Sequence, residues 1–240
     1  MAASLDVSRI RAVLFDLDGT LFEVKRGTAN GHLARRLRFM APLLPGRDPE
    51  AFVRRFFVVS ETPTNYVLAA LDRMRLEAIL QPLADRARRA KGIGTSVSST
   101  LVPGAAQTIE ALRARYQLAV LTNRSRAQAA NLLARHELRD AFAAITTRGD
   151  LWRFKPHPQA IRHTAARLDI PPESVLMVGD MPVDMQTARR AGAQAVGVLT
   201  GFGTPSELWG AGATIILPSV AELPAILLAS ENGLDLPQTT

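Results

Sequence analysis

The 240-residue sequence contains no cysteine. Disulfide bonds, thiolate metal sites and cysteine nucleophiles are therefore excluded, and any metal ion must be held by oxygen or imidazole ligands. No apolar run approaches the roughly 20 residues that a membrane span requires, and residues 1–11 lack the apolar core of a signal peptide. The sequence predicts a cytoplasmic protein with no membrane partner.

Aromatic residues make up only 5% of the chain, and lysines number 3 against 26 arginines. Residues 23–97 hold 14 of the 29 Lys and Arg but 7 of the 22 Asp and Glu, so the net charge of +7 arises in this segment. Nucleic-acid binders usually combine basic charge with an aromatic platform or a recognisable helix motif. Neither is present, so we expect no nucleic-acid partner, and the arginine excess is also typical of a codon bias.

Hydrophobic residues (47%) and charged residues (21%) are balanced as in a globular protein. Short apolar runs typical of buried strands occur at 12–15, 118–121, 142–145, 175–178, 195–198 and 214–217. Helical spacing of apolar residues occurs at 105–115, 127–136, 158–168, 185–191 and 220–228. The alternation predicts an α/β fold with a doubly wound, Rossmann-like parallel sheet, in which ligands bind beyond the carboxyl ends of the strands.

The alternation is interrupted between the first two strands. Helical patterns without a strand run occupy 28–40, 49–60, 65–80 and 82–91. We therefore predict an α/β core formed by residues 1–22 and 98–240, with a helical domain inserted at 23–97. The two chain crossings would act as a hinge, as in lids over active sites.

Two acidic pairs follow predicted strands. Asp16 and Asp18 stand in Asp-Leu-Asp-Gly-Thr after the first strand, and Asp180 and Asp184 follow the run 175–178. For the first pair alone, a solvated acidic turn is the alternative. Because strand ends of a parallel sheet converge, these carboxylates would repel one another unless a cation neutralised them. The pattern indicates a magnesium site.

Further polar residues near strand ends suit phosphate. Lys155 would supply a cation and Thr122 a hydroxyl donor, although Thr122 could instead cap the following helix and Lys155 could be a surface lysine. His157 lies in a Pro-His-Pro turn and is interpreted as a solvated loop residue. Gly201 and Gly203 are interpreted as a plain turn with no functional role.

The four motifs, in this order, resemble those of the haloacid dehalogenase (HAD) superfamily, in particular its phosphoglycolate phosphatase-like branch, whose helical cap falls where residues 23–97 lie. The resemblance implies that Asp16 is the nucleophile that receives the phosphoryl group and that Asp18 is the general acid and base. It also implies that Thr122 and Lys155 bind phosphoryl oxygens. The backbone N–H of Asn123 is a further candidate donor to phosphate.

The resemblance also implies a metal site. Mg²⁺ would bridge Asp16, the phosphate and Asp180, and Asp18 would add its backbone carbonyl. Asp184 would either bind the metal directly or support its ligands, and the sequence leaves both open. The preference among Mg²⁺, Mn²⁺ and Co²⁺ depends on coordination geometry.

The expected function is a Mg²⁺-dependent phosphatase that hydrolyses a small anionic phosphate monoester, phosphoglycolate-like or a sugar phosphate, through an aspartyl-phosphate. A phosphomutase of the same superfamily, acting on a sugar phosphate, is the alternative. A non-catalytic binding module is less favoured because every motif residue is present. Arginines of the insert such as Arg26, Arg35 and Arg36 could recognise a carboxylate or a second phosphate of the substrate, but the sequence selects none of them. It also does not distinguish a monomer from a homodimer.

Overall fold

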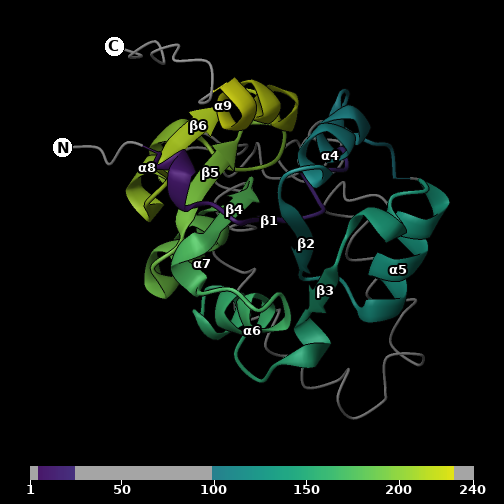
Figure 1. The fold of residues 1–240 in the computed structure, drawn as a ribbon, viewed down its shortest axis with the longest axis horizontal. Coiled ribbons are helices and arrows are strands. Elements are labelled where there is room, and N and C mark those ends of the chain that lie inside the picture. Colours follow the sequence, from purple (N-terminus) through teal and green to yellow (C-terminus); the bar gives the residue numbers. More distant parts are fainter. Residues whose placement is uncertain (1–4, 25–98, 230–240) are drawn as a thin grey trace, which may run out of the picture.

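The computed structural model describes residues 5–24 and 99–229, which form a six-stranded parallel sheet with helices on both faces (Figure 1). The strands are β1 (Ala12–Phe15), β2 (Gln117–Thr122), β3 (Ala144–Thr147), β4 (Val175–Gly179), β5 (Gln194–Val198) and β6 (Ile215–Leu217). They are ordered β3-β2-β1-β4-β5-β6, and each neighbouring pair is parallel. The predicted doubly wound α/β core is confirmed. The predicted helical insert at 23–97 lies almost entirely outside the described residues and stays a prediction.

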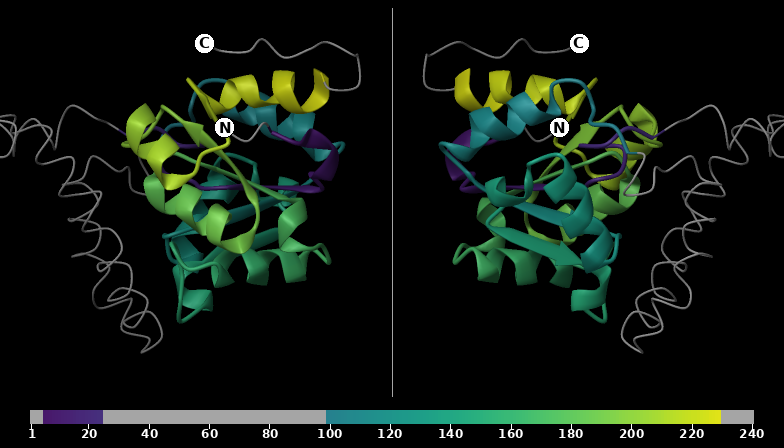
Figure 2. Two further views of the ribbon diagram at one scale, coloured as in Figure 1. Left: turned by 90° about the vertical axis from the view of Figure 1, so that its left-hand side faces the viewer. Right: turned by 90° about the vertical axis from the view of Figure 1, so that its right-hand side faces the viewer.

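The helices form two layers, one on each face of the sheet (Figure 2). One layer contains α4 (Ala105–Arg113), α5 (Arg126–Arg135) and α9 (Leu223–Ala229), and the other contains α6 (Gln159–Arg167), α7 (Pro182–Ala191) and α8 (Pro205–Ala211). Among the helices of the described ranges, none is long and apolar enough to cross a membrane.

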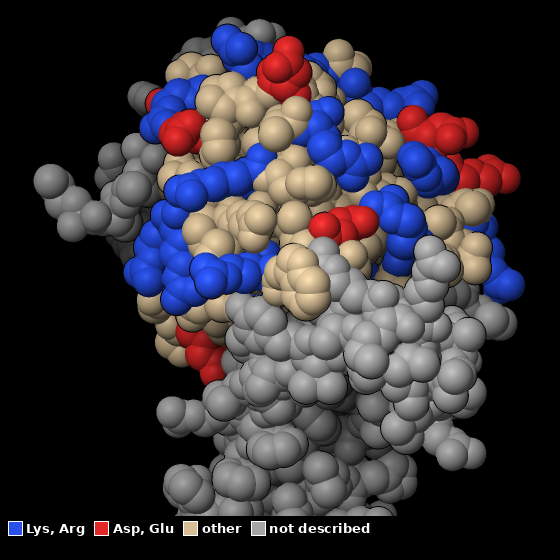
Figure 3. Space-filling view, turned by 90° about the horizontal axis from the view of Figure 1, so that it is seen from below, with Lys and Arg blue, Asp and Glu red and all other residues tan. Residues whose placement is uncertain are grey.

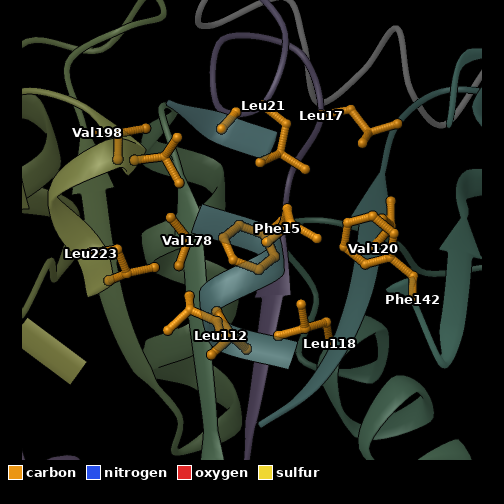
Figure 4. Packing of buried hydrophobic residues seen from close by; sticks show 14 of the residues in the cluster. Phe15, Leu17, Leu21, Leu112, Leu118, Val120, Phe142, Val178, Val198 and Leu223 are labelled. Atoms are coloured by element: carbon orange, nitrogen blue, oxygen red, sulfur yellow. The ribbon is translucent and has the colours of Figure 1, made fainter. Parts of the chain in front are cut away.

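The central strand β1 is buried on both faces, which explains its unbroken apolar run. Val13 and Phe15 point into the layer of α4 and α9, whereas Leu14 faces α6 and α7. Figure 4 shows Phe15 at the centre of the first of these clusters. Its ring meets that of Phe142 edge-on at a centroid distance of 6.4 Å, a favoured aromatic geometry. This packing fixes the strand end from which the acidic motif follows.

The position of β3 differs from the predicted strand at 142–145. The structure has β3 at Ala144–Thr147, and its last two residues, Thr146 and Thr147, are fully buried. The Thr164 hydroxyl donates to the Thr146 hydroxyl at 2.8 Å, which satisfies polar groups in the core. The prediction ended the strand at its last apolar residue, although threonine is favoured in strands.

Helix α8 was not predicted, although its sequence carries end signals. Thr204 and Glu207 form a reciprocal capping box, Pro205 occupies the first turn and Gly212 ends the helix with φ 108°. Each is a standard helix boundary signal. Its 7 residues are too few to show a clear helical spacing of apolar positions. Helix α7 likewise begins at Pro182, ahead of the predicted start at 185.

Asp150 closes the turn between β3 and the loop that carries Lys155. Its Oδ2 accepts hydrogen bonds from the Thr147 backbone N–H (2.7 Å) and hydroxyl (3.0 Å), and its Oδ1 lies 2.6 Å from an Arg126 nitrogen. Partial burial would raise the pKa of Asp150, but the hydrogen bonds from Arg126 and Thr147 outweigh it, so this pKa lies below its usual range. The ionised carboxylate therefore stabilises the fold.

We expect Asp150→Asn to lower the free energy of unfolding by about 1 kcal/mol at pH 7. A carboxyl group with a lowered folded-state pKa stabilises above its unfolded pKa of about 3.9, and this contribution is lost as the pH falls through the folded value. Urea unfolding should show a smaller deficit at pH 3 than at pH 7. The exposed Asp140, changed to Asn, is the matched control, and an equal deficit at both pH values would contradict the electrostatic account.

Candidate active site

The carboxyl ends of β1, β2 and β4 bring the predicted site residues to one edge of the sheet. Asp16 directly follows β1, Thr122 ends β2 and Asp180 directly follows β4. The Asp16 backbone N–H donates to the Val178 carbonyl at 2.9 Å, so Asp16 and Asp180 extend from adjacent, hydrogen-bonded strands. β1 and β4 also flank the point where the strand order reverses, which is where such sheets bind ligands.

Lys155 joins two carboxylates of this edge. Its Nζ lies 2.7 Å from Asp16 Oδ1 and 2.7 Å from Asp184 Oδ1. All three side chains are buried, with the Lys155 side chain 1% exposed. The interpretation of Lys155 as a surface lysine is therefore wrong.

The pKa values follow from burial and from this ion pairing. Burial raises the pKa of Asp16 to about 7 against the opposing charge of Lys155, and Asp184 and Asp18 add repulsion. Burial would lower the pKa of Lys155, but the carboxylates of Asp16 and Asp184 outweigh it and raise that pKa. Lys155 is therefore held charged. One ammonium facing several carboxylates leaves excess negative charge at this edge, which further positive charge would relieve.

Asp184 has two partners in the structure. Besides the ion pair with Lys155, its Oδ2 accepts from the Met181 backbone N–H at 3.2 Å at the start of α7. The same carboxylate therefore caps the start of α7 and orients Lys155. These contacts bear on the question that the sequence left open, whether Asp184 binds a metal directly.

A glycine-containing loop after β5 encloses Asp180, a feature that the sequence analysis missed. The Phe202 N–H donates to Asp180 Oδ2 at 2.8 Å, and the Gly203 N–H donates to the Asp180 carbonyl at 3.1 Å. A Cβ built on Gly201 would lie 1.7 Å from Asp180 Oδ2, and one on Gly19 would lie 2.5 Å from the same atom. The interpretation of Gly201 and Gly203 as a plain turn is therefore incomplete, because the loop positions a carboxylate of the site.

Asp18 pairs with Arg124, which the sequence analysis did not select. Arg124 Nε lies 3.1 Å from Asp18 Oδ1 and 2.9 Å from Oδ2, and a terminal nitrogen lies 2.5 Å from Oδ1. Arg124 is 1% exposed. Nothing in the local sequence distinguishes it from the other arginines, because its partner is 106 positions away.

The segment after β2 is held by several contacts. Thr122 Oγ1 accepts from the Arg124 backbone N–H at 3.2 Å, and the Asn123 carbonyl accepts from an Arg148 side-chain nitrogen. Ser125, whose hydroxyl accepts from the Gln128 N–H, caps α5. The alternative that Thr122 caps this helix is therefore wrong. Thr122 and Asn123 lie at the expected edge, and their phosphate contacts stay predictions.

The donor set fits a hard cation. Among residues 5–24 and 99–229, no group of three or more His, Asp or Glu side chains is placed to hold a metal ion by itself. Mg²⁺ does not require one, since it usually takes one or two carboxylates together with water and substrate phosphate. Asp16 and Asp180 supply two carboxylates from adjacent strand ends, and the enclosing glycines keep bulkier groups away from Asp180.

Comparison with known proteins identifies the family. A family model described as haloacid dehalogenase-like hydrolase matches residues 10–192. The chain belongs to the haloacid dehalogenase-like hydrolase family. Phosphoglycolate phosphatase of Chromobacterium violaceum is 32% identical to this HAD hydrolase over 224 residues, covering 91% of the chain and 97% of the relative. The enzyme of the same name from Nitrosospira multiformis is 28% identical over 237 residues, covering 92% and 97%.

A solved structure extends the likeness to three dimensions. A HAD family hydrolase from Deinococcus radiodurans R1, crystallised with bound phosphate and sodium, is 28% identical, with a TM-score of 0.63 and coverage of 93% of this chain and 97% of that one. The predicted superfamily and its phosphoglycolate phosphatase-like branch are confirmed. This HAD hydrolase is an enzyme of the phosphatase kind.

We expect Gly201→Ala to destabilise this HAD hydrolase by about 1–3 kcal/mol, because the added methyl group meets a buried carboxylate. Gly210 in α8 has no atom within 4 Å of an added Cβ. Gly210→Ala is therefore the matched control and should be neutral or stabilising by up to about 1 kcal/mol. Urea unfolding of both variants tests this, and a Gly201→Ala variant as stable as the control would show that the loop does not hold Asp180 tightly.

Proposed function

We propose that this enzyme hydrolyses a small phosphate monoester with Asp16 as nucleophile and Mg²⁺ as cofactor. The observation that carries the proposal is the buried contact of Lys155 with Asp16 and Asp184 at the switch point of the sheet. This contact keeps the Asp16 carboxylate next to the positive charge of Lys155, which attracts phosphate, at the carboxyl end of β1. The phosphatase relatives support the reaction class.

In the first step a carboxylate oxygen of Asp16 attacks phosphorus, and the ester oxygen leaves with the phosphorus–oxygen electron pair. Asp18 protonates that oxygen, which leaves as an alcohol. In the second step water attacks the aspartyl-phosphate while Asp18 takes its proton, and inorganic phosphate leaves Asp16. The single hard displacement becomes two easier ones.

The remaining residues bind and orient. Lys155 offsets negative charge on the phosphoryl oxygens while it holds Asp16, and Thr122 and the Asn123 N–H donate to those oxygens. Asp16, Asp180 and the Asp18 carbonyl would hold Mg²⁺, which supplies positive charge to the phosphoryl group. We infer that Asp184 acts by orienting Lys155, because its Oδ1 lies against that ammonium.

Surface charge suits an anionic substrate. Figure 3 views the described core from the side of α6, where Lys and Arg side chains gather. Desolvation lowers the pKa of His157, and the positive charges of Arg153, Arg162 and Arg190 nearby lower it further. Such a field raises the local concentration of phosphate esters. We propose phosphoglycolate as the first substrate to examine, because both relatives compared above are named phosphoglycolate phosphatase.

We expect phosphate release from 4-nitrophenyl phosphate and from a panel led by phosphoglycolate, only in the presence of Mg²⁺. Asp16→Asn should reduce the rate by at least about 10⁴-fold because the nucleophile is lost. Asp140→Asn, an exposed site, is the control and should keep the wild-type rate. Conversion of one sugar phosphate isomer into another without phosphate release would instead establish the phosphomutase.

Asp180 and Asp184 should respond differently to Mg²⁺. Asp180→Asn removes a proposed ligand and should raise the Mg²⁺ concentration for half-maximal activity by about 10–100-fold. Asp184→Asn should mainly lower kcat, because it disturbs Lys155. Melting temperatures measured across a Mg²⁺ titration give a readout that is independent of activity, and equal Mg²⁺ shifts for the two variants would place Asp184 on the metal.

A further inference from the structure

Arg124 contacts Asp18 through several hydrogen bonds, but the reaction proposed above gives this arginine no role. Its guanidinium makes three nitrogen–oxygen contacts of 2.5–3.1 Å and engages both oxygens of one carboxylate. The Arg124 side chain is 1% exposed, whereas the Asp18 side chain is 18% exposed. The arginine therefore contacts Asp18 from the more deeply buried side, and the Asp18 side chain keeps a small exposed fraction.

Arg124 is itself held at its base. Its backbone N–H donates to Thr122 Oγ1, and the next residue, Ser125, caps α5 through a capping box with Gln128. A second buried arginine, Arg148, donates to the carbonyl of Asn123. These contacts hold the backbone on both sides of Arg124, and they therefore fix the point from which its side chain extends.

The chemistry of the fork suits orientation more than charge balance. A planar guanidinium that contacts both oxygens fixes the plane of a carboxyl group, whereas an ammonium acts as a point charge. Each carboxylate oxygen can accept more than one hydrogen bond, so the fork does not exhaust the capacity of Asp18. Proton transfer depends strongly on such placement, because donor and acceptor must come within hydrogen-bond reach.

We propose that Arg124 is a positioning residue that holds the Asp18 carboxyl group in one orientation for proton transfer to and from the substrate. This inference rests on the proposed function. Arg124, which follows β2, acts through Asp18, which follows β1. Arg124 itself need not contact the substrate.

The test compares two esters that differ in their need for an acid. Release of 4-nitrophenolate needs little protonation, whereas release of an alkoxide from an alkyl phosphate needs a proton from Asp18. Arg124→Met should lower kcat/KM by about 100-fold for the alkyl ester and by less than about 10-fold for the aryl ester. Asp18→Asn should show the same selectivity.

A double-mutant cycle and a matched control separate positioning from general damage. Combining Arg124→Met with Asp18→Asn should be no worse than Asp18→Asn alone, because Arg124 acts only through Asp18. Arg148→Met removes a buried arginine of the same segment that contacts Asn123 instead. It should affect both esters to the same degree.

Further variants keep the test usable if the methionine variant does not fold. Arg124→Lys keeps the buried charge but lacks the fork, so it should retain the selective loss on the alkyl ester. Added methylguanidinium should partly restore alkyl-ester turnover in Arg124→Ala.

The outcomes are distinguishable. Equal losses on both esters in Arg124→Met or Arg124→Lys, or losses that multiply with those of Asp18→Asn, would overturn the positioning role while the phosphatase stands. A wild-type enzyme that releases no phosphate from either ester overturns the proposed function, and this inference with it.

Discussion

Carboxylates buried close together at one end of a parallel sheet repel one another, and the rest of this site is arranged around that repulsion. The positive charge of Lys155 offsets this repulsion, because its Nζ lies 2.7 Å from Asp16 Oδ1 and 2.7 Å from Asp184 Oδ1. Asp184 lies in the first turn of α7, where the helix dipole favours a negative charge. The loop after β3 must therefore deliver the lysine to a point between β1 and α7, and the capping contacts of Asp150 shape the start of that loop.

Asp180 and Asp18 are held in place by different kinds of hydrogen-bond donor. On the β4 side, backbone N–H groups of the loop after β5 bind Asp180, and glycines admit that loop to close contact. On the β2 side, the guanidinium of Arg124 binds Asp18. Backbone donors carry no net charge and leave a carboxylate able to bind a cation, whereas a guanidinium that contacts both oxygens fixes the plane of the carboxyl group. The two kinds of donor therefore agree with the two roles proposed for Asp180 and Asp18.

Local patterns in the sequence were sufficient for the sheet and for the acidic motifs. β1 and β4 are unbroken apolar runs because both faces of each strand are buried, and the carboxylates follow directly. The extent of β3 and the whole of α8 were lost because buried threonines look polar and a short helix has little periodicity. Arg124 could not be found, since it is one of 26 arginines and its partner is 106 positions distant.

The use of one lysine and one arginine at neighbouring strand ends has a geometric reason. A compact ammonium can lie 2.7 Å from oxygens of two different residues, as Lys155 does, and it can turn toward a third oxygen as charge develops there. A guanidinium group instead donates to both oxygens of one carboxyl group and so fixes the plane of that carboxyl group. Exchanging the two cations would give Asp16 a rigid partner and Asp18 a loose one, the reverse of what a nucleophile and a proton carrier require.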